Sequence, residues 1–252
     1  MGSLSGKRAL VTGGGQGIGL ATVELLLDAG CDVAVHYFSD SPPAELDARA
    51  AARGRRIVRL RADLTGQEAA DKLVDDAVAF LGGLDILVNN AGGLIGRRTL
   101  GEVDPPFWQK VIDVNMTSAL LVTRHAAPSL AAAGASAVVN VASLAGRKGG
   151  HGGSLVYAMT KGAILTMTRA LSAELAGEGI RVNAVAPGLI LGTRFHNTFT
   201  TKESADATVR QIPLGRPGNV ADVARAIVYL ASEFDGFITG ATLDINGGIY
   251  CA

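Results

Sequence analysis

Two side chains that together can carry acid–base chemistry, Tyr157 and Lys161, stand four residues apart. Residues at this spacing share one face of a helix, which places a phenol beside an ammonium group. A tyrosine with a pKa near ~10 exchanges protons poorly at neutral pH, and a neighbouring cation lowers that pKa by stabilising the phenolate. The pair therefore predicts proton exchange with an alcohol or a carbonyl oxygen. The same spacing is also common on solvated helix faces.

Two further polar residues fit such a site. Ser143 follows the apolar run 137–142, where its hydroxyl could hydrogen-bond a reacting oxygen, and Asn115 lies inside the helical stretch 105–130. Asparagine is disfavoured in helix interiors, so a polar role is expected, a solvated side chain being the alternative. The two cysteines, Cys31 and Cys251, cannot build a zinc site or a disulfide framework. No metal is predicted, and a reduced, cytoplasmic setting is favoured.

A glycine-rich segment, Thr12–Gly19 (TGGGQGIG), follows the first apolar run and opens the first helical stretch. Glycines let the backbone turn tightly and approach a pyrophosphate, while the helix N-terminus offers free N–H groups. The position inside a strand–helix–strand unit predicts dinucleotide binding rather than a merely tight turn. The glycine spacing is not the commonest one for dinucleotides.

The end of the second predicted strand should select the cofactor. An acidic residue there binds the 2′-hydroxyl of NAD, and a basic one suits the 2′-phosphate of NADP. Tyr37 stands where the acid is expected, Phe38 and Ser39 follow, Asp40 lies past it, and no Lys or Arg is close in sequence. The missing acid favours NADP(H) over NAD(H), and the missing base leaves use of both open.

The elements that must position these residues alternate along the chain. Apolar runs at 8–12, 32–37, 56–61, 85–89, 137–142, 181–186 and 242–245 read as strands, separated by helical stretches at 18–28, 44–53, 67–81, 105–130, 154–176 and 219–232. This order predicts an α/β fold, a Rossmann-type doubly wound parallel sheet of about seven strands. We expect one domain over 1–252, with the irregular segment 188–218 as a substrate lid.

Composition excludes several function classes. The 252 residues carry 23 basic and 23 acidic side chains, so the neutral chain lacks the electrostatic footprint of a nucleic-acid binder. A hydrophobic share of 48% argues against disorder, and no run of 18 apolar residues is present to span a membrane. The 33 glycines exceed the usual share of about 7% without a three-residue period.

Taken together, the motifs resemble the short-chain dehydrogenase/reductase family from Lys7 to Gly248. The resemblance implies that Tyr157 is the general acid–base and that Lys161 lowers its pKa and holds the nicotinamide ribose. It also implies that Ser143 orients the substrate oxygen and that Asn115 supports a proton-relay water. Its implied cofactor contacts are Thr12, Gly13, Gly15, Gln16, Gly17, Ile18, Gly19, Tyr37, Phe38, Ser39, Asp63, Leu64, Asn89, Ala91, Gly92, Tyr157, Lys161, Pro187, Gly188, Ile190 and Thr193.

The chain departs from the family in one motif, because Thr193 comes one residue late after Pro187 and Gly188. Its expected contact with the nicotinamide amide is therefore in doubt. By the resemblance, the protein is a homotetramer, a dimer of dimers, in which the helices that start at Pro105 and Ser154 pack across an interface. Alanines on the second of these helices would allow close approach or, equally, internal packing.

The predicted substrate loops are rich in basic residues, which suggests a small anionic substrate; solvated loop charges are the equal alternative. Besides Ser143, the candidates are Arg97, His151, Arg194 and His196. Short stretches such as 90–97 and 238–248 are similar to bacterial reductases of 4-deoxy-hexoseulose uronate, a carboxylated sugar derivative. A 3-oxoacyl carrier-protein reductase and a polyol or sugar dehydrogenase are the enzymatic alternatives. A dinucleotide-sensing regulator is the non-enzymatic one.

Overall fold

The computed structural model describes residues 4–232 and 236–252, apart from the side chains of residues 195–197. Its centre is a seven-stranded, entirely parallel sheet in the order β3-β2-β1-β4-β5-β6-β7. The strands are β1 (Arg8–Val11), β2 (Asp32–Tyr37), β3 (Ile57–Arg61), β4 (Ile86–Asn89), β5 (Ser136–Val141), β6 (Ile180–Pro187) and β7 (Thr242–Ile245). The predicted Rossmann-type fold is confirmed, and each predicted strand is found with its ends within one residue.

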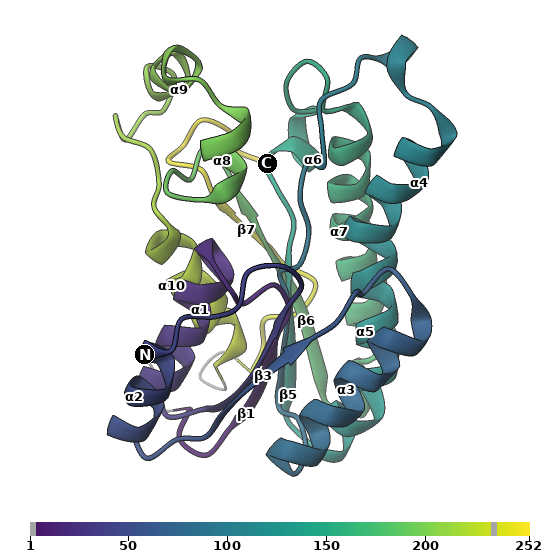
Figure 1. Ribbon diagram of the computed structural model, residues 1–252, viewed down its shortest axis with the longest axis vertical. Helices are drawn as coiled ribbons and strands as arrows, with labels where there is room; N and C mark the ends of the chain where they lie inside the picture. Colours follow the sequence, from purple (N-terminus) through teal and green to yellow (C-terminus); the bar gives the residue numbers. More distant parts are fainter. Residues whose placement is uncertain (1–3, 233–235) are drawn as a thin grey trace.

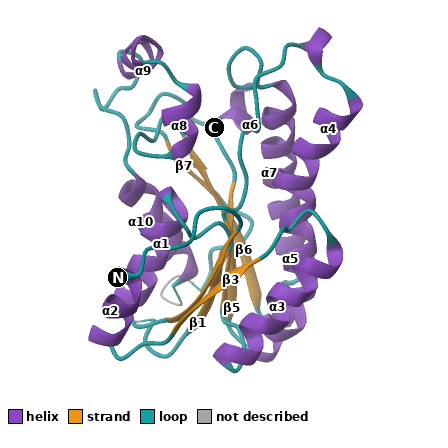
Figure 2. Ribbon diagram, viewed as in Figure 1, coloured by secondary structure: helices purple, strands orange, loops and turns teal. Residues whose placement is uncertain are grey.

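Helices cover both faces of the sheet (Figures 1 and 2). One layer holds α1 (Gly17–Asp28), α2 (Glu45–Ala52) and α10 (Val220–Ala231), and the other holds α3 (Gln67–Leu81), α5 (Ser118–Ala132) and α7 (Leu155–Glu174). Beyond the carboxyl ends of the strands lie α4 (Pro105–Ile112), α6 (Ala145–Lys148), α8 (Arg194–Phe199) and α9 (Lys202–Val209). Two short helical turns are η1 (Leu100–Glu102) and η3 (Ala176–Glu178).

Each face of the sheet has its own hydrophobic core, and alternate residues of a strand contribute to one core or the other. In β1, Ala9 and Val11 pack toward α1 and α10, while Leu10 packs toward α3 and α5. All three side chains are fully buried. Side chains of successive strand residues point to opposite faces, so a strand covered on both faces has to be apolar throughout. This explains why the strand runs show no alternation in the sequence.

The predicted helix 105–130 is not one regular helix. It consists of α4, a π-helical turn η2 (Asp113–Thr117) and α5, which continues past Pro128 to Ala132. A π turn inserts an extra residue into the helix and is often found at functional sites. Here it contains Asn115.

The chain reverses its direction of travel across the sheet between β3 and β4, which flank β2 and β1. Ligands of open α/β sheets bind at this switch point, beyond the carboxyl ends of the strands. The glycine-rich turn, Asn90 and Ser143 all follow the carboxyl ends of central strands. The fold therefore gathers the candidate residues at one edge.

Candidate active site

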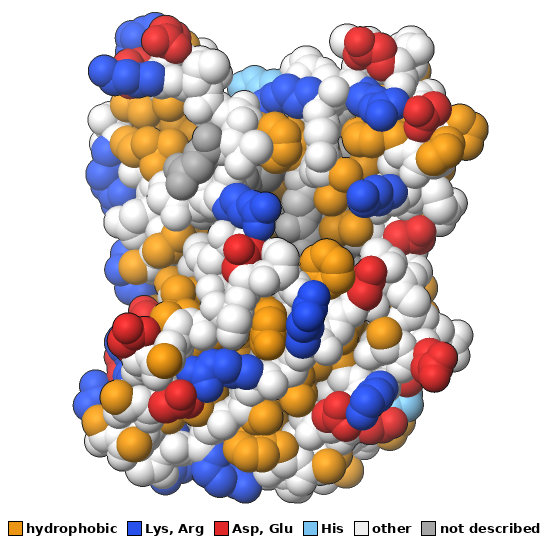
Figure 3. All heavy atoms as spheres, in the orientation of Figure 1, with side chains coloured by type: hydrophobic (Ala, Val, Ile, Leu, Met, Phe, Trp, Pro, Cys, Tyr) orange, Lys and Arg blue, Asp and Glu red, His pale blue; other side chains and the backbone are white. Residues whose placement is uncertain are grey.

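A cavity of about 930 Å³ opens along the carboxyl edge of the sheet. It runs from the glycine-rich turn and the end of β2 to Ser143, Tyr157 and the loop around His151. On the face shown in Figure 3 the upper part of the molecule is hollowed between the α8–α9 side and the α4–α6 side, with Lys and Arg side chains along the furrow. Its length and polar ends suit an elongated ligand.

The glycine-rich turn is shaped for a close approach. Gly13 has φ +64°, and a Cβ there would lie 3.0 Å from the Cα of Ala91. A Cβ on Gly19 would lie 2.6 Å from Asn90 Nδ2 and closer still to the Gly13 carbonyl oxygen. Asn90 locks the turn by donating to the carbonyl oxygens of Thr12 at 3.0 Å and Gly13 at 2.9 Å.

The N-terminus of α1 fits a pyrophosphate. Gln16 stands at the N-cap without capping the helix, since its amide donates to Asp40 at 3.0 Å instead. The first turn of α1 has no acidic residue, and Gln16, Gly17 and Ile18 line the cavity. Free backbone N–H groups and the positive end of the helix dipole therefore face the space that an anion would fill.

Most predicted cofactor contacts line the cavity: Gly13, Gly15, Gln16, Gly17, Ile18, Tyr37, Phe38, Ser39, Asp63, Leu64, Ala91, Gly92, Tyr157, Lys161, Pro187, Gly188, Ile190 and Thr193. Thr12 and Gly19 lie beneath the turn, and the Thr12 hydroxyl accepts from the N–H groups of Asn90 and Ala91, each at 3.0 Å. These two shape the turn without reaching the cavity.

Asn89 is placed differently from the prediction. Its amide points into the core, donating to Thr123 Oγ1 at 2.8 Å and Asn140 Oδ1 at 2.9 Å, whereas Asn90 lines the cavity. Successive strand residues face opposite sides, so only one of the two adjacent asparagines could turn toward the glycine-rich turn. The sequence did not show which one.

His36 is a residue that the sequence reasoning missed. Its ring is buried at 2% exposure, accepts the Gly13 N–H at Nδ1 (3.1 Å) and contacts the Ala62 carbonyl oxygen through Nε2 (3.1 Å). Burial lowers the pKa of His36 and keeps the ring neutral. It thereby ties the glycine-rich turn to the loop after β3.

Two arginines converge on the end of β2, although none is near it in sequence. Arg61 Nε donates to the Phe38 carbonyl oxygen at 3.1 Å, and Arg194 donates to Asp40 Oδ2 at 2.7 Å. The expectation of no base beside this segment was therefore wrong. The two arginines are distant in sequence but close in space, because β3 pairs with β2 and the segment after Ile190 folds back over the glycine-rich turn.

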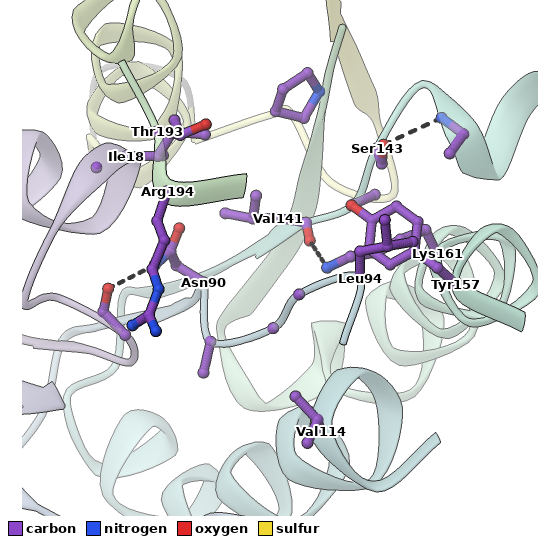
Figure 4. A pocket seen from close by; sticks show the side chains of 18 of the residues that line it. Ile18, Asn90, Leu94, Val114, Val141, Ser143, Tyr157, Lys161, Thr193 and Arg194 are labelled. Carbon is purple, nitrogen blue, oxygen red and sulfur yellow. Dashed lines mark hydrogen bonds between the residues drawn. The ribbon is translucent and has the colours of Figure 1, made fainter. Parts of the chain in front are cut away.

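Arg194 lines the cavity at a different place from the other predicted substrate residues. Figure 4 shows it on the side of Ile18 and Asn90, apart from Ser143, Tyr157 and Lys161. Its ion pair with Asp40 holds it at the dinucleotide end of the cavity. Its predicted substrate role stays a prediction, although in this structure Arg194 lies nearer the glycine-rich turn than the other predicted substrate residues.

The acid–base candidates come together as expected. Ser143 follows β5, while Tyr157 and Lys161 share one face of α7, with Lys161 Nζ 5.8 Å from the centroid of the Tyr157 ring. Ser143 hydrogen-bonds Tyr157, and its oxygen also accepts the Ala145 N–H at 3.1 Å. Gly146 allows the loop after β5 to lie against α7, since a Cβ there would be 2.6 Å from the Lys161 carbonyl carbon.

The electrostatics of the pair differ from the prediction. Burial raises the pKa of Tyr157, and the hydrogen bond with Ser143 opposes that rise. Lys161 points instead at the Val141 carbonyl oxygen, 2.8 Å away, and burial lowers the pKa of its ammonium to about 8. The net shift of the Tyr157 pKa is therefore upward instead of downward, because desolvation of the buried phenol dominates.

Asn115 is buried at 1% exposure and does not line the cavity. Its Oδ1 accepts the Gly93 N–H at 2.9 Å, while Nδ2 donates to the carbonyl oxygens of Gly93 (2.9 Å) and Val111 (3.0 Å). The side chain thus clamps the loop after β4 to η2. Its predicted link to a proton-relay water stays a prediction.

At the substrate end, Arg97, His151 and Ser143 line the cavity, while the side chain of His196 lies outside the described residues. Arg97 bridges two loops by donating to the carbonyl oxygens of Gly152 at 2.8 Å and Phe199 at 3.2 Å. Lys148, which was not among the predicted site residues, also lines the cavity, and no ion pair forms to it within the described chain. Its place five residues after Ser143, in the same segment that follows β5, was the available signal.

The segment predicted as a lid is folded and leaves the main body of the protein between β6 and α10. It leaves and returns at a parallel bridge between Ile190 and Gly218 and carries α8 and α9. Thr193, whose late position was in doubt, lines the cavity, donates to the Ile190 carbonyl oxygen at 3.2 Å, and lies with its Cγ2 3.7 Å from the Cβ position of Gly17. The segment predicted as a lid therefore begins against the glycine-rich turn.

The fold and the cavity define a nicotinamide dinucleotide-dependent oxidoreductase of the Rossmann type. A family model described as enoyl-(acyl carrier protein) reductase matches residues 13–250. The chain belongs to the short-chain dehydrogenase/reductase family, and it is an NAD(P)-dependent enzyme of that family.

Individual relatives agree with this. The chain is 37% identical to cis-4-hydroxycyclohexanecarboxylate dehydrogenase of Sinomonas cyclohexanicum, covering 95% of each chain. It is 33% identical to a 3-oxoacyl-[acyl-carrier-protein] reductase of Staphylococcus aureus, covering 97% of this chain and 98% of the relative. It is also 37% identical to the solved NADH-dependent reductase A1-R′, responsible for alginate metabolism, with a TM-score of 0.89 and 99% of each chain covered. That reductase has also been solved with NAD.

No helix within residues 4–232 and 236–252 is long and apolar enough to cross a membrane.

Proposed function

We propose that the protein interconverts a carbonyl and an alcohol on a small, carboxylated, sugar-derived substrate, with Tyr157 as the acid–base group. The observation that carries the proposal is the convergence of Ser143, Tyr157 and Lys161 on one wall of the cavity whose other end is shaped for a dinucleotide. The bound nicotinamide dinucleotide supplies or accepts the hydride at the carbinol carbon.

In the reducing direction, Ser143 holds the carbonyl oxygen and Tyr157 donates its phenolic proton to it. The raised pKa of Tyr157 keeps the phenol protonated at neutral pH, as this donation requires. The Lys161 ammonium, 5.8 Å from the ring, stabilises the phenolate that remains until solvent returns a proton. In the oxidising direction the phenolate accepts the alcohol proton.

Cofactor residues follow from the cavity lining. The glycine-rich turn and the N-terminus of α1 would hold the pyrophosphate, and Asp63 with Leu64 the adenine. Gly188 lies beside the position of the nicotinamide that the family resemblance implies. We propose NADP(H) as the preferred cofactor, supported by Arg61 and Arg194 beside Phe38 and Asp40.

An anionic substrate is supported by the charges at the Tyr157 end. Arg98 and Arg147 are neutralised by Asp104 and Asp244, so they do not contribute to this surface. Arg97 and Lys148 line the cavity without a carboxylate partner in the described chain, beside His151. The name of the Sinomonas relative specifies a carboxylate, and that of A1-R′ specifies alginate metabolism.

A substrate screen with NADH and NADPH tests the proposal on keto-uronates, uncharged sugars, polyols and acetoacetyl thioesters. We expect the highest kcat/KM on a keto-uronate. Lys148→Ser should raise its KM about 10-fold through one lost charge-assisted contact and leave uncharged substrates within about 2-fold. Lys72→Ser, a surface variant on α3, serves as the control. Activity only on the thioester would replace the sugar-acid assignment.

Three alternatives are distinguished by the same screen. A 3-oxoacyl carrier-protein reductase, as in the Staphylococcus relative, would act on the thioester, and a polyol dehydrogenase would oxidise neutral alcohols. A dinucleotide-sensing regulator would bind cofactor without turnover on any substrate. The complete set of Ser143, Tyr157 and Lys161 argues against that last reading.

We also propose a cytoplasmic homotetramer, a dimer of dimers. Apolar side chains on neighbouring helices support it: Trp108 of α4, Leu120 of α5, and Leu155 and Met159 of α7 are each at least 36% exposed. Ala158 is buried inside the protomer, so it does not contribute to such an interface. Sedimentation at micromolar concentration should give about four times 25.8 kDa. A monomer under these conditions would refute the assembly.

A further inference from the structure

One ion pair joins the lid to the dinucleotide end of the cavity. Arg194, the first residue of α8, reaches across 154 positions of sequence to Asp40, with NH1 2.7 Å from Oδ2. The same carboxylate oxygen accepts from Ser39 Oγ at 2.7 Å and from Gln16 Nε2 at 3.0 Å. The lid is thus held directly beside the N-cap of α1, as Figure 4 shows for Arg194 and Ile18.

The Arg194–Asp40 ion pair can be replaced by another partner of Arg194. The side chains of Arg194 and Asp40 are 63% and 49% exposed, and an ion pair so open to solvent stabilises the fold only weakly. Asp40 would keep its bonds to Gln16 and Ser39 if the guanidinium moved away. Releasing Arg194 therefore leaves no buried charge unpaired.

A second guanidinium lies at the same place. Arg61 is exposed, donates through Nε to the Phe38 carbonyl oxygen, and makes no ion pair within the part of the chain that the structure describes. Arg61 and Arg194 are thus anchored on the three residues 38–40, which carry one carboxylate. A phosphate monoester brings a charge of about −1.5 to −2 and binds a guanidinium through paired N–H groups.

We propose that Arg194 is a cofactor-selecting residue carried by the lid, for whose guanidinium Asp40 and the 2′-phosphate of NADP(H) compete. With NADP(H), Arg194 exchanges Asp40 for the phosphate, beside Arg61. With NAD(H), which lacks that phosphate, the Arg194–Asp40 pair stays closed. The inference rests on the proposed dinucleotide function and adds that lid position depends on which cofactor is bound.

Binding of the fragments 2′,5′-ADP and 5′-AMP by calorimetry tests the inference without catalysis. Arg194→Gln should weaken 2′,5′-ADP about 10-fold and leave 5′-AMP within about 2-fold. Asp40→Asn should tighten 2′,5′-ADP several-fold, because it frees the guanidinium and removes a repelling carboxylate. Arg210→Gln, at the exposed end of α9 on the same lid, is the matched control and should change neither constant.

The outcomes distinguish failure of the inference about Arg194 from failure of the proposed dinucleotide function. If Arg194→Gln weakened the binding of both fragments equally, Arg194 would hold the lid in place without selecting the cofactor. If neither dissociation constant changed, Arg194 would not belong to the binding site. Either result overturns the inference while the dinucleotide function stands. Failure of the wild-type protein to bind NADH, NADPH and both fragments would overturn the function and the inference together.

Discussion

Tyr157→Phe should lower kcat by about 10³-fold or more while the dissociation constants of NADH and NADPH change by less than about 2-fold. The substitution removes one oxygen from the cavity wall and with it the only described phenol that hydrogen-bonds Ser143. General acid–base groups contribute on the order of 10²–10⁴-fold to rate. The ring itself remains, so the shape of the cavity is retained. Steady-state kinetics and fluorescence titration measure the two effects separately.

The matched control is Tyr229→Phe, which removes a phenol from α10 outside the cavity. It should leave both kcat and cofactor affinity within about 2-fold of wild type. Parallel losses of turnover and cofactor binding in Tyr157→Phe would sink the acid–base role of Tyr157. In that case the phenol would serve mainly to hold the dinucleotide.

Lys161→Met should abolish most activity and yet make the protein more stable at neutral pH. The ammonium is 4% exposed, and burial lowers its pKa from the ordinary 10.5 to about 8. At about 1.4 kcal/mol per pKa unit this corresponds to roughly 3 kcal/mol of destabilisation below pH 8. Losing the hydrogen bond to Val141 offsets about 1 kcal/mol of the gain. Turnover should fall at least about 10²-fold, because the cation beside Tyr157 is gone.

The pH dependence of the free energy of unfolding identifies the cause of the expected stabilisation in Lys161→Met. Between pH 8 and 10.5 the unfolded chain holds a proton on Lys161 that the folded protein has released, so wild-type stability rises with pH in this window. The advantage of Lys161→Met in the free energy of unfolding should therefore shrink from pH 8 upward. Urea denaturation at several pH values measures it, with Lys72→Met on the surface of α3 as the control. A pH-independent difference, or a variant less stable at pH 7, would contradict the account.

Short-range chemistry explains why much of the site was predictable. Tyr157 and Lys161 are set four apart by helix geometry alone, and Ser143 and the glycine-rich turn follow strands whose apolar runs are unmistakable. All of these residues lie at the carboxyl edge because parallel strands point the same way. The structure therefore brings them into one cavity.

Predictions were incomplete where a side chain's partner lies far along the chain. Arg194 was assigned to the substrate, but its pair with Asp40, which forms because the lid folds back onto the glycine-rich turn, was not predicted. Asn89 and Asn90 are indistinguishable by type, and only the strand's orientation between its two helix layers decides which one faces the cavity. The clamping role of His36 requires the Gly13 and Ala62 backbones to meet around it.

The sequence by itself determined the class of fold, the order of its elements, and the positions of the acid–base candidates and the glycine-rich turn. These depend on hydrophobic period, glycine placement and helical spacing, which act over a few residues. Only the tertiary structure decided where the charges act. Arg98, Arg147 and Arg194 are each neutralised by a carboxylate, and two of those carboxylates, Asp244 and Asp40, are about a hundred or more positions away. Lys148 and Arg97 keep their charge for the cavity, because Coulomb interaction depends on distance in space and not along the chain.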